Sequence, residues 1–173
     1  MIICVDADYR PREIVAAAAG IQNWNDAVPC MECVALLRQL PAPYIAGQLY
    51  LREMPAIVVL LAKIASFRLI VVDGYVWLGK DRRGFGAHLY EHLEGRYPVI
   101  GAAKRPFRDN DCAVAVRRGK SDRPLYVTAI GIELGQASEA IGRMHGSHRI
   151  PTILKRVDRL ARAAHTDTRP CDQ

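Results

Sequence analysis

The sequence predicts an α/β protein built on a mixed β-sheet. Two observations lead to this prediction. Three strand-like segments follow one another near the N-terminus, a pattern typical of an antiparallel meander. After about residue 50, short apolar segments alternate with segments whose apolar residues recur at helical spacing, a pattern typical of βα units.

The elements are expected in a definite order. Strands at residues 2–6, 14–21 and 28–37 form the meander, because turn-forming residues separate the second from the third. Prolines then break the chain before a helix over residues 52–66, with an apolar stripe of Met54, Val58, Leu61 and Ala65. The remaining elements are strands at 69–72, 98–102, 112–117 and 125–130 and helices at 86–94, 136–144 and 151–164.

A meander followed by βα units, flanked by helices, is the layout of the ribonuclease H-like fold, whose fourth strand lies beside the first. The 173 residues suit a single domain. We expect that domain to cover residues 1–164 and residues 165–173 to form a disordered tail. No apolar run reaches membrane length and no signal-peptide pattern occurs, so a cytoplasmic protein without a membrane partner is expected.

The charge distribution indicates a polyanionic partner. The net charge is +6, yet residues 1–60 contain more acidic than basic side chains, so the positive charge belongs to the rest of the chain. Basic residues cluster around Lys80–Arg83, Lys104–Arg108 and Arg117–Arg123. Nucleic acid is the partner that such clusters favour, although a solvated basic surface explains the charge equally well.

Two predicted strands end in an aspartate. Strand 2–6 ends at Asp6 and strand 69–72 leads into Asp73. If the two strands are parallel neighbours, both carboxylates emerge at the same edge of the sheet. Two such carboxylates repel each other unless a cation lies between them, and Mg²⁺ or Mn²⁺ prefers oxygen ligands. Each aspartate alone is equally well explained as a turn former or helix cap, and Asp8 is a competing acid on the same strand face.

A third carboxylate, Glu53, lies in the first turn of the helix that precedes residue 69. It is either a further metal ligand or an acid that stabilises the positive end of the helix dipole. The residues leave both interpretations open.

Several segments of the chain are similar to motifs of the endonuclease V family, in the family's order. PYIAGQLYLRE (43–53) resembles its PYIPG-x-L-x-FRE motif, VVDG (71–74) its VDG motif, and VIGAAK (99–104) its IGVAK strand. Weaker similarities are found in CVDADY (4–9), RRGFGAH (82–88), RPLYVTAIGIELGQASEAI (123–141) and HRIPTILKRVDRLAR (148–162), the last to an LPEPTRLAD-type segment.

The resemblance implies a ribonuclease H-like fold and a specific reaction. Members cut a nucleic acid strand at the second phosphodiester bond 3′ to a deaminated adenine and use Mg²⁺ or Mn²⁺. By position, the resemblance assigns Asp6, Glu53 and Asp73 as catalytic metal ligands. Lys104 matches the family's lysine near the scissile phosphate, where a cation stabilises developing charge, although a plain surface lysine is the simpler explanation.

The resemblance also implies a nucleic-acid surface. The family's strand-separating wedge matches Pro43, Tyr44, Ile45 and, with alanine in place of its second proline, Ala46. Prising open a base step costs about a few kcal/mol. The remaining nucleic-acid contacts expected from the resemblance and from the basic cluster are Gly47, Gly74, Arg82, Arg83 and Lys104.

One departure from the family bears on catalysis. The family has a Gly-His pair after its late strand, and the position matched to the histidine is Gly131 here. His88 or Glu133 would be the substitute, unless both are ordinary helix and surface residues. The alternative function is therefore a catalytically degenerate relative that binds nucleic acid without cutting it. A small-molecule α/β enzyme is disfavoured because no GxGxxG phosphate loop occurs.

Overall fold

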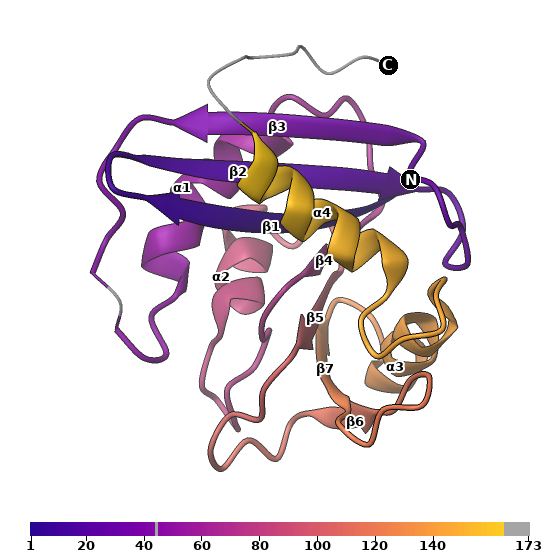
Figure 1. Ribbon diagram of the computed structural model, residues 1–173. Coiled ribbons are helices and arrows are strands. Elements are labelled where there is room, and N and C mark those ends of the chain that lie inside the picture. Colours follow the sequence, from indigo (N-terminus) through magenta and orange to yellow (C-terminus); the bar gives the residue numbers. More distant parts are fainter. Residues whose placement is uncertain (44, 165–173) are drawn as a thin grey trace.

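The computed structural model describes residues 1–43 and 45–164. Its strands form one mixed sheet in the order β3-β2-β1-β4-β5-β7-β6, with helices on both faces (Figure 1). The strands are β1 (Ile2–Arg10), β2 (Glu13–Ile21), β3 (Met31–Leu37), β4 (Leu69–Val72), β5 (Val99–Ala103), β6 (Val114–Val116) and β7 (Leu125–Ile130). The helices are α1 (Tyr50–Leu61), α2 (Phe85–His92), α3 (Leu134–Arg143) and α4 (Thr152–Ala163).

The pairing of the strands confirms the predicted α/β fold. β1, β2 and β3 form the antiparallel meander, and β4 lies parallel to β1, from the pair Ile2 and Leu69 to the pair Val5 and Val72. β5 continues the parallel part beside β4, and β7 and β6 complete the sheet in antiparallel fashion. Three neighbouring parallel strands, β1, β4 and β5, therefore end at one edge of the sheet.

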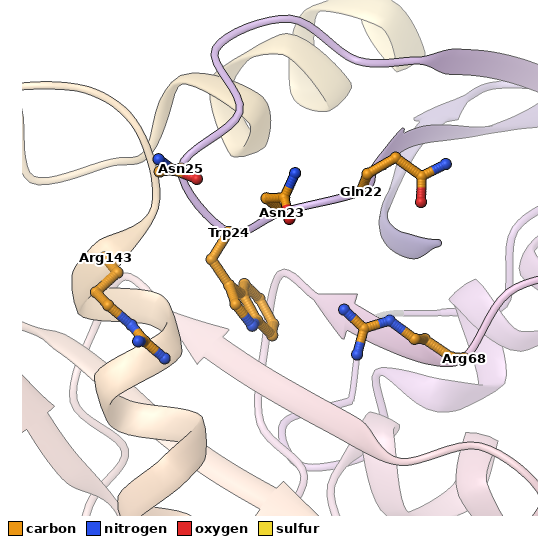
Figure 2. Close-up of a pocket in the computed structure, with 6 residues that line it drawn as sticks. All are labelled: Gln22, Asn23, Trp24, Asn25, Arg68 and Arg143. Carbon is orange, nitrogen blue, oxygen red and sulfur yellow. The ribbon is translucent and has the colours of Figure 1, made fainter.

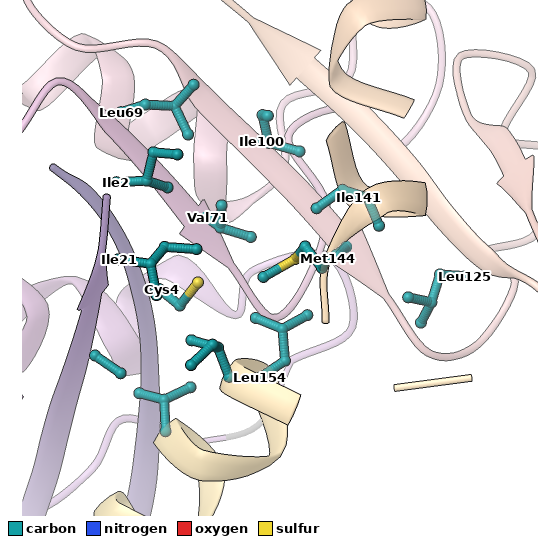
Figure 3. Packing of buried hydrophobic residues seen from close by; sticks show 14 of the residues in the cluster. Ile2, Cys4, Ile21, Leu69, Val71, Ile100, Leu125, Ile141, Met144 and Leu154 are labelled. Carbon is teal, nitrogen blue, oxygen red and sulfur yellow. The ribbon is translucent and has the colours of Figure 1, made fainter. Parts of the chain in front are cut away.

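Alternation along the strands divides the core into two halves. Ile2 and Cys4 of β1 point to the face that α3 and α4 cover, whereas Ile3 and Val5 point to the face covered by α1 and α2. Figure 3 shows part of the first half, where Cys4 and Val71 pack with side chains of α3 and α4. Asp6 continues the even-numbered series of β1, so alternation places it on the α4 side of the sheet.

Several predicted elements differ in length from those observed, and β3 and β6 are each about three residues shorter than predicted. β1 continues past Asp6 to Arg10, because its hairpin with β2 is closed by the pair of Arg10 and Glu13, whose side chains form an ion pair of 2.9 Å. α1 runs from Tyr50 to Leu61 instead of over 52–66. The chain leaves the helix there to turn back towards β4.

The predicted apolar stripe of α1 is correct only in part, since Leu61 is buried and Met54 packs against the core, but Val58 is only half-buried. The buried residues are Glu53, Ala56, Ile57, Leu60 and Leu61, while the predicted Ala65 lies beyond the helix and is exposed. The apolar residues of α1 are too numerous to define one face by themselves. The consequence is that Glu53 belongs to the buried face.

None of the helices in the described part of the chain is long and apolar enough to cross a membrane. The cytoplasmic location stays a prediction, as does the assignment of residues 1–164 to one domain. The predicted tail, residues 165–173, lies outside the described residues.

Candidate functional site

The carboxyl ends of the three parallel strands bring three predicted site residues together. Asp6 and Asp73 directly follow Val5 and Val72, which are partners in the register of β1 and β4. Lys104 directly follows β5, and its Nζ forms an ion pair and hydrogen bond with Oδ2 of Asp73. The expectation that both aspartates lie at one edge of the sheet is therefore met.

The electrostatics of this edge show that negative charge is crowded there. Burial and the nearby charge of Asp73 raise the pKa of Asp6 to about 7, despite the hydrogen bond that its Oδ1 accepts from the amide of Ala7 at 2.8 Å. Burial alone would lower the pKa of Lys104, but the charge and hydrogen bond of Asp73 raise it overall. Lys104 thus neutralises part of the charge that a bound cation would neutralise.

Glu53 reaches the same region from α1. Its side chain is only 8 % exposed, and its Oε1 accepts a 2.5 Å hydrogen bond from the hydroxyl of Tyr9. Burial is the main cause that raises the pKa of Glu53 to about 8, and the charges of Asp6 and Asp73 contribute. The tyrosine stabilises a carboxylate that the core would otherwise disfavour.

Asp158 of α4 is a further acid of this region that reasoning from sequence missed. Burial and Asp73 are the larger causes of the raised pKa of Asp6, but the charge of Asp158 adds to it and also helps to raise the pKa of Lys104. Its carboxylate accepts a hydrogen bond from Arg162 at 2.9 Å. The signal was present, because the LPEPTRLAD-type segment ends in an aspartate that matches Asp158.

Arg149, in the segment before α4, supports the backbone that carries Lys104. Its guanidinium donates hydrogen bonds to the carbonyl oxygen of Lys104 and, at 2.9 and 3.2 Å, to that of Pro124. The end of β5 and the start of β7 are thereby tied together. This contact helps to hold Lys104 at the sheet edge.

The donor set fits a divalent cation in chemical type. Carboxylate oxygens from β1, from the end of β4 and from α1 are the ligands that Mg²⁺ and Mn²⁺ prefer, and the raised pKa values of Asp6 and Glu53 mark charge that such an ion would compensate. Within residues 1–43 and 45–164, no group of three or more histidine, cysteine or acidic side chains is arranged closely enough to hold a metal ion. The predicted three-carboxylate ligand set stays a prediction.

The predicted wedge lies in the loop between β3 and α1. Pro43, Ile45 and Ala46 are exposed, and Ile45 is among the most exposed large apolar residues of the described chain. Tyr44, on which the wedge prediction chiefly depends, lies outside the described residues. Gly47 has a φ of +82°, and a Cβ there would lie 2.8 Å from Nη2 of Arg82, so the loop closely approaches a predicted nucleic-acid contact.

Other predicted contact residues have partners within the protein. The guanidinium of Arg82 lies 5.0 Å from the ring centre of Phe107, and Arg83 pairs with Glu91 at 3.0 Å. Both arginines are exposed. Gly74, directly after Asp73, has a φ of +155° and open space where a Cβ would stand.

Asp8, the competing acid on β1, forms an ion pair of 3.3 Å with Arg10. Asp8 is thus paired with Arg10, whereas Lys104 pairs with Asp73. This arrangement favours Asp6 over Asp8 as the acid of the sheet edge.

The position matched to the family histidine accommodates glycine well. Gly131 has a φ of +74°, and a Cβ there would lie 2.9 Å from the ring of Tyr90, so a histidine would be strained. The conformation suits the glycine of a Gly-His pair, so the histidine of that pair would fall at Ile132. Neither position 131 nor position 132 holds a histidine.

The two residues suggested as substitutes have other contacts. His88 stacks on Tyr50 at a ring distance of 3.8 Å, and Glu133 precedes α3 as its N-cap.

Comparisons with known proteins point in one direction. The model of the endonuclease V family matches residues 1–159. Endonuclease V of Streptomyces coelicolor is 30 % identical over 94 % of this chain and 78 % of its own, and that of Ignicoccus hospitalis is 28 % identical over 92 % and 80 %.

Solved structures show the same likeness. Endonuclease V from Streptomyces avermitilis has a TM-score of 0.79 at 27 % identity, over 93 % of this chain and 79 % of its own. Ciona intestinalis endonuclease V, in complex with a 24mer DNA containing an inosine followed by a ribo-adenosine, has a TM-score of 0.74 over 93 % and 84 %. Its identity is 18 %, so this second likeness concerns the fold.

Proposed function

The chain belongs to the endonuclease V family, and on that premise we propose that it is a metal-dependent repair endonuclease that cleaves a phosphodiester bond 3′ to inosine in DNA or RNA. The observation that carries the proposal is the pair of aspartates, Asp6 and Asp73, after paired positions of β1 and β4. Glu53, Lys104 and Asp158 supply further charge at the same edge.

Asp6 and Asp73, with Glu53, would hold Mg²⁺ or Mn²⁺. Such an ion supplies an activated water and stabilises the leaving oxygen in phosphodiester cleavage. The raised pKa of Asp6 supports this role. Burial and the charge of Asp73 disfavour its carboxylate, so a bound cation would stabilise the charged form and release the proton.

Other residues act on the nucleic acid. Lys104 is suited to stabilise charge on the scissile phosphate, and its present partner, Asp73, holds its ammonium at the site. Pro43 and Ile45 are exposed on the loop before α1, which supports a wedge that opens the strand beside the inosine. Arg82 and Arg83 are exposed and suited to phosphate contacts.

One observation favours the alternative, nucleic-acid binding without cleavage. Neither Gly131 nor Ile132 can do the work of the family histidine, and His88 is packed against Tyr50. Asp158 weakens this alternative, since it adds an acid to the site from α4, at the end of the segment that resembles LPEPTRLAD.

The test is a cleavage assay on matched single strands. DNA and RNA oligonucleotides with one inosine, and the same strands with adenine, are incubated with the protein in Mn²⁺, in Mg²⁺ and in chelator. We expect cleavage only of the inosine strands and only with metal. Binding without cleavage in every metal would establish the alternative, and cleavage in chelator would refute the role of the metal.

A further inference from the structure

A cavity lies at the opposite end of the sheet from the carboxylates. It has a volume of about 470 Å³ and is lined by Gln22, Asn23, Trp24, Asn25, Arg68 and Arg143. Four of these residues belong to the loop after β2, Arg68 directly precedes β4, and Arg143 ends α3. Figure 2 shows the indole of Trp24 between the side chains of the two arginines.

The Trp24 side chain forms a fixed platform. It is half-buried and packs against the core half beneath α3 and α4. Its loop is held by Asp26, whose Oδ2 accepts hydrogen bonds from the amides of Gln22 at 3.0 Å and Asn23 at 2.9 Å. A ligand that stacks on the indole therefore meets a surface that is already ordered, which reduces the entropic cost of binding.

The two arginines have donors to spare. Both are exposed, and in the described part of the chain neither guanidinium has a hydrogen bond or ion pair with another residue. The acid of this loop, Asp26, is engaged by backbone amides, which lower its pKa. Since no acidic side chain lines the cavity, an anion would be attracted from both sides.

We propose that this cavity is a second ligand site, which binds a nucleobase that carries a phosphate. The planar base stacks on Trp24, as bases do on aromatic platforms. Arg68 and Arg143 bind the phosphate, because a guanidinium offers paired donors to phosphate oxygens. The side-chain amide of Asn25, which also lines the cavity, offers a donor and an acceptor to the edge of a base. The volume is in the usual range for small-molecule sites of about 300–1,000 Å³.

The site is separate from the proposed cleavage site and does not depend on it. Arg68 and Asp73 are five residues apart across β4, which is about 16 Å along an extended strand. The same chemistry is offered by a free nucleotide and by a single-stranded stretch of nucleic acid. Binding is measurable without cleavage, so failure of one proposal leaves the other intact.

The test uses Trp24 as its own reporter. The chain has two tryptophans, so a Trp77→Phe variant leaves Trp24 as the only tryptophan, which is excited selectively at a wavelength that tyrosine does not absorb. This variant is titrated with adenosine monophosphate, adenosine, inorganic phosphate and an unmodified oligothymidylate. Each titration is repeated by calorimetry on the unmodified protein, so that the result does not depend on folding of the variant. We expect saturable quenching by the monophosphate, the oligothymidylate or both, with adenosine and phosphate alone about tenfold weaker or more. Whichever of the two binds more tightly identifies the source of the ligand.

Matched variants decide the assignment. Arg68→Ala and Arg143→Ala should each weaken binding about tenfold, the loss expected for a charge-assisted hydrogen bond. Arg12→Ala, an exposed arginine in the turn at the other end of β2, should change it less than about twofold. The proposal is overturned if neither the monophosphate nor the oligothymidylate binds saturably. It is also overturned if all three variants lose the same amount of affinity, because that would reveal only general attraction to a basic protein.

Discussion

The two ends of the central strands carry opposite chemistry on the same scaffold. At the carboxyl ends, Asp6, Asp73 and the nearby Glu53 crowd negative charge, and the pKa of two of these carboxyls is raised. At the amino ends, Arg68 and Arg143 flank an indole with no acid in the cavity. The net charge of +6 therefore does not indicate where a cation or an anion binds. The binding sites depend on which charged side chains lie at each end of β1 and β4.

The largest effect is expected when an acidic side chain is removed from the carboxyl ends of the strands. We predict that Asp73→Ala lowers the cleavage rate of inosine-containing strands by about 10³-fold or more, because the ion loses a ligand. Binding of the strand in chelator should stay within about twofold, since affinity comes mainly from basic contacts to phosphates. Single-turnover cleavage and filter binding measure the two effects.

The control for this variant is Asp122→Ala, an exposed aspartate in the loop between β6 and β7. It should cleave like the unmodified protein. Equal cleavage by the Asp73 variant, in a protein shown to be folded, would mean that this carboxylate has no part in the reaction.

The Asp158→Asn variant tests the acidic side chain that α4 places near the carboxyl ends of the strands. Its charge acts on Asp6 and Lys104, so we predict a loss of about 10²-fold in cleavage with little change in melting temperature. Glu139→Gln on the exposed face of α3 is the matched control. A loss confined to stability would assign Asp158 to its bond with Arg162 alone.

The raised pKa of Asp6, caused first by burial and then by the charge of Asp73, predicts a dependence of stability on pH. In metal-free buffer the pKa of Asp6 in the folded protein is about 7, whereas an aspartate in an unfolded chain has a pKa of about 3.8. The contribution of Asp6 is thus fully present below pH 3.8 and is lost as the pH rises through about 7. Asp6→Asn should flatten the decline between these values, by up to about 2–4 kcal/mol.

Chemical denaturation at pH 5 and pH 8 measures this effect. Glu53, whose pKa is raised to about 8, adds a decline of the same sign that the Asp6 variant retains. Identical declines in the variant and the unmodified protein would show that Asp6 ionises in the folded state without hindrance.

The smallest expected effect concerns the support of Glu53. Tyr9→Phe removes the hydroxyl that donates to its Oε1, which should cost about 1–3 kcal/mol of stability at pH 9, where the carboxylate is charged. Below the raised pKa of Glu53 the loss should shrink. A loss of the same size at pH 6 and pH 9 would indicate that the hydroxyl matters only for packing.

Much of this arrangement is predictable from sequence, and the failures have physical causes. The apolar run of β4 and its terminal Asp73 are read correctly because a buried strand leaves a continuous apolar signal. Asp158 was missed because a single acid among the basic residues of α4 resembles an ordinary solvated helix face. The Trp24 cavity was missed because its parts come from the loop after β2, the start of β4 and the end of α3, which only the fold brings together.

The central claim is that the carboxyl ends of β1 and β4 hold a divalent cation. The most direct measurement is a crystal of the protein soaked in Mn²⁺, with the anomalous signal of manganese used to locate the ion. The account predicts a peak bonded to carboxylate oxygens of Asp6 and Asp73, and its loss in crystals of the Asp73→Ala variant. A peak at other residues, or none at a Mn²⁺ concentration that supports cleavage, would contradict it.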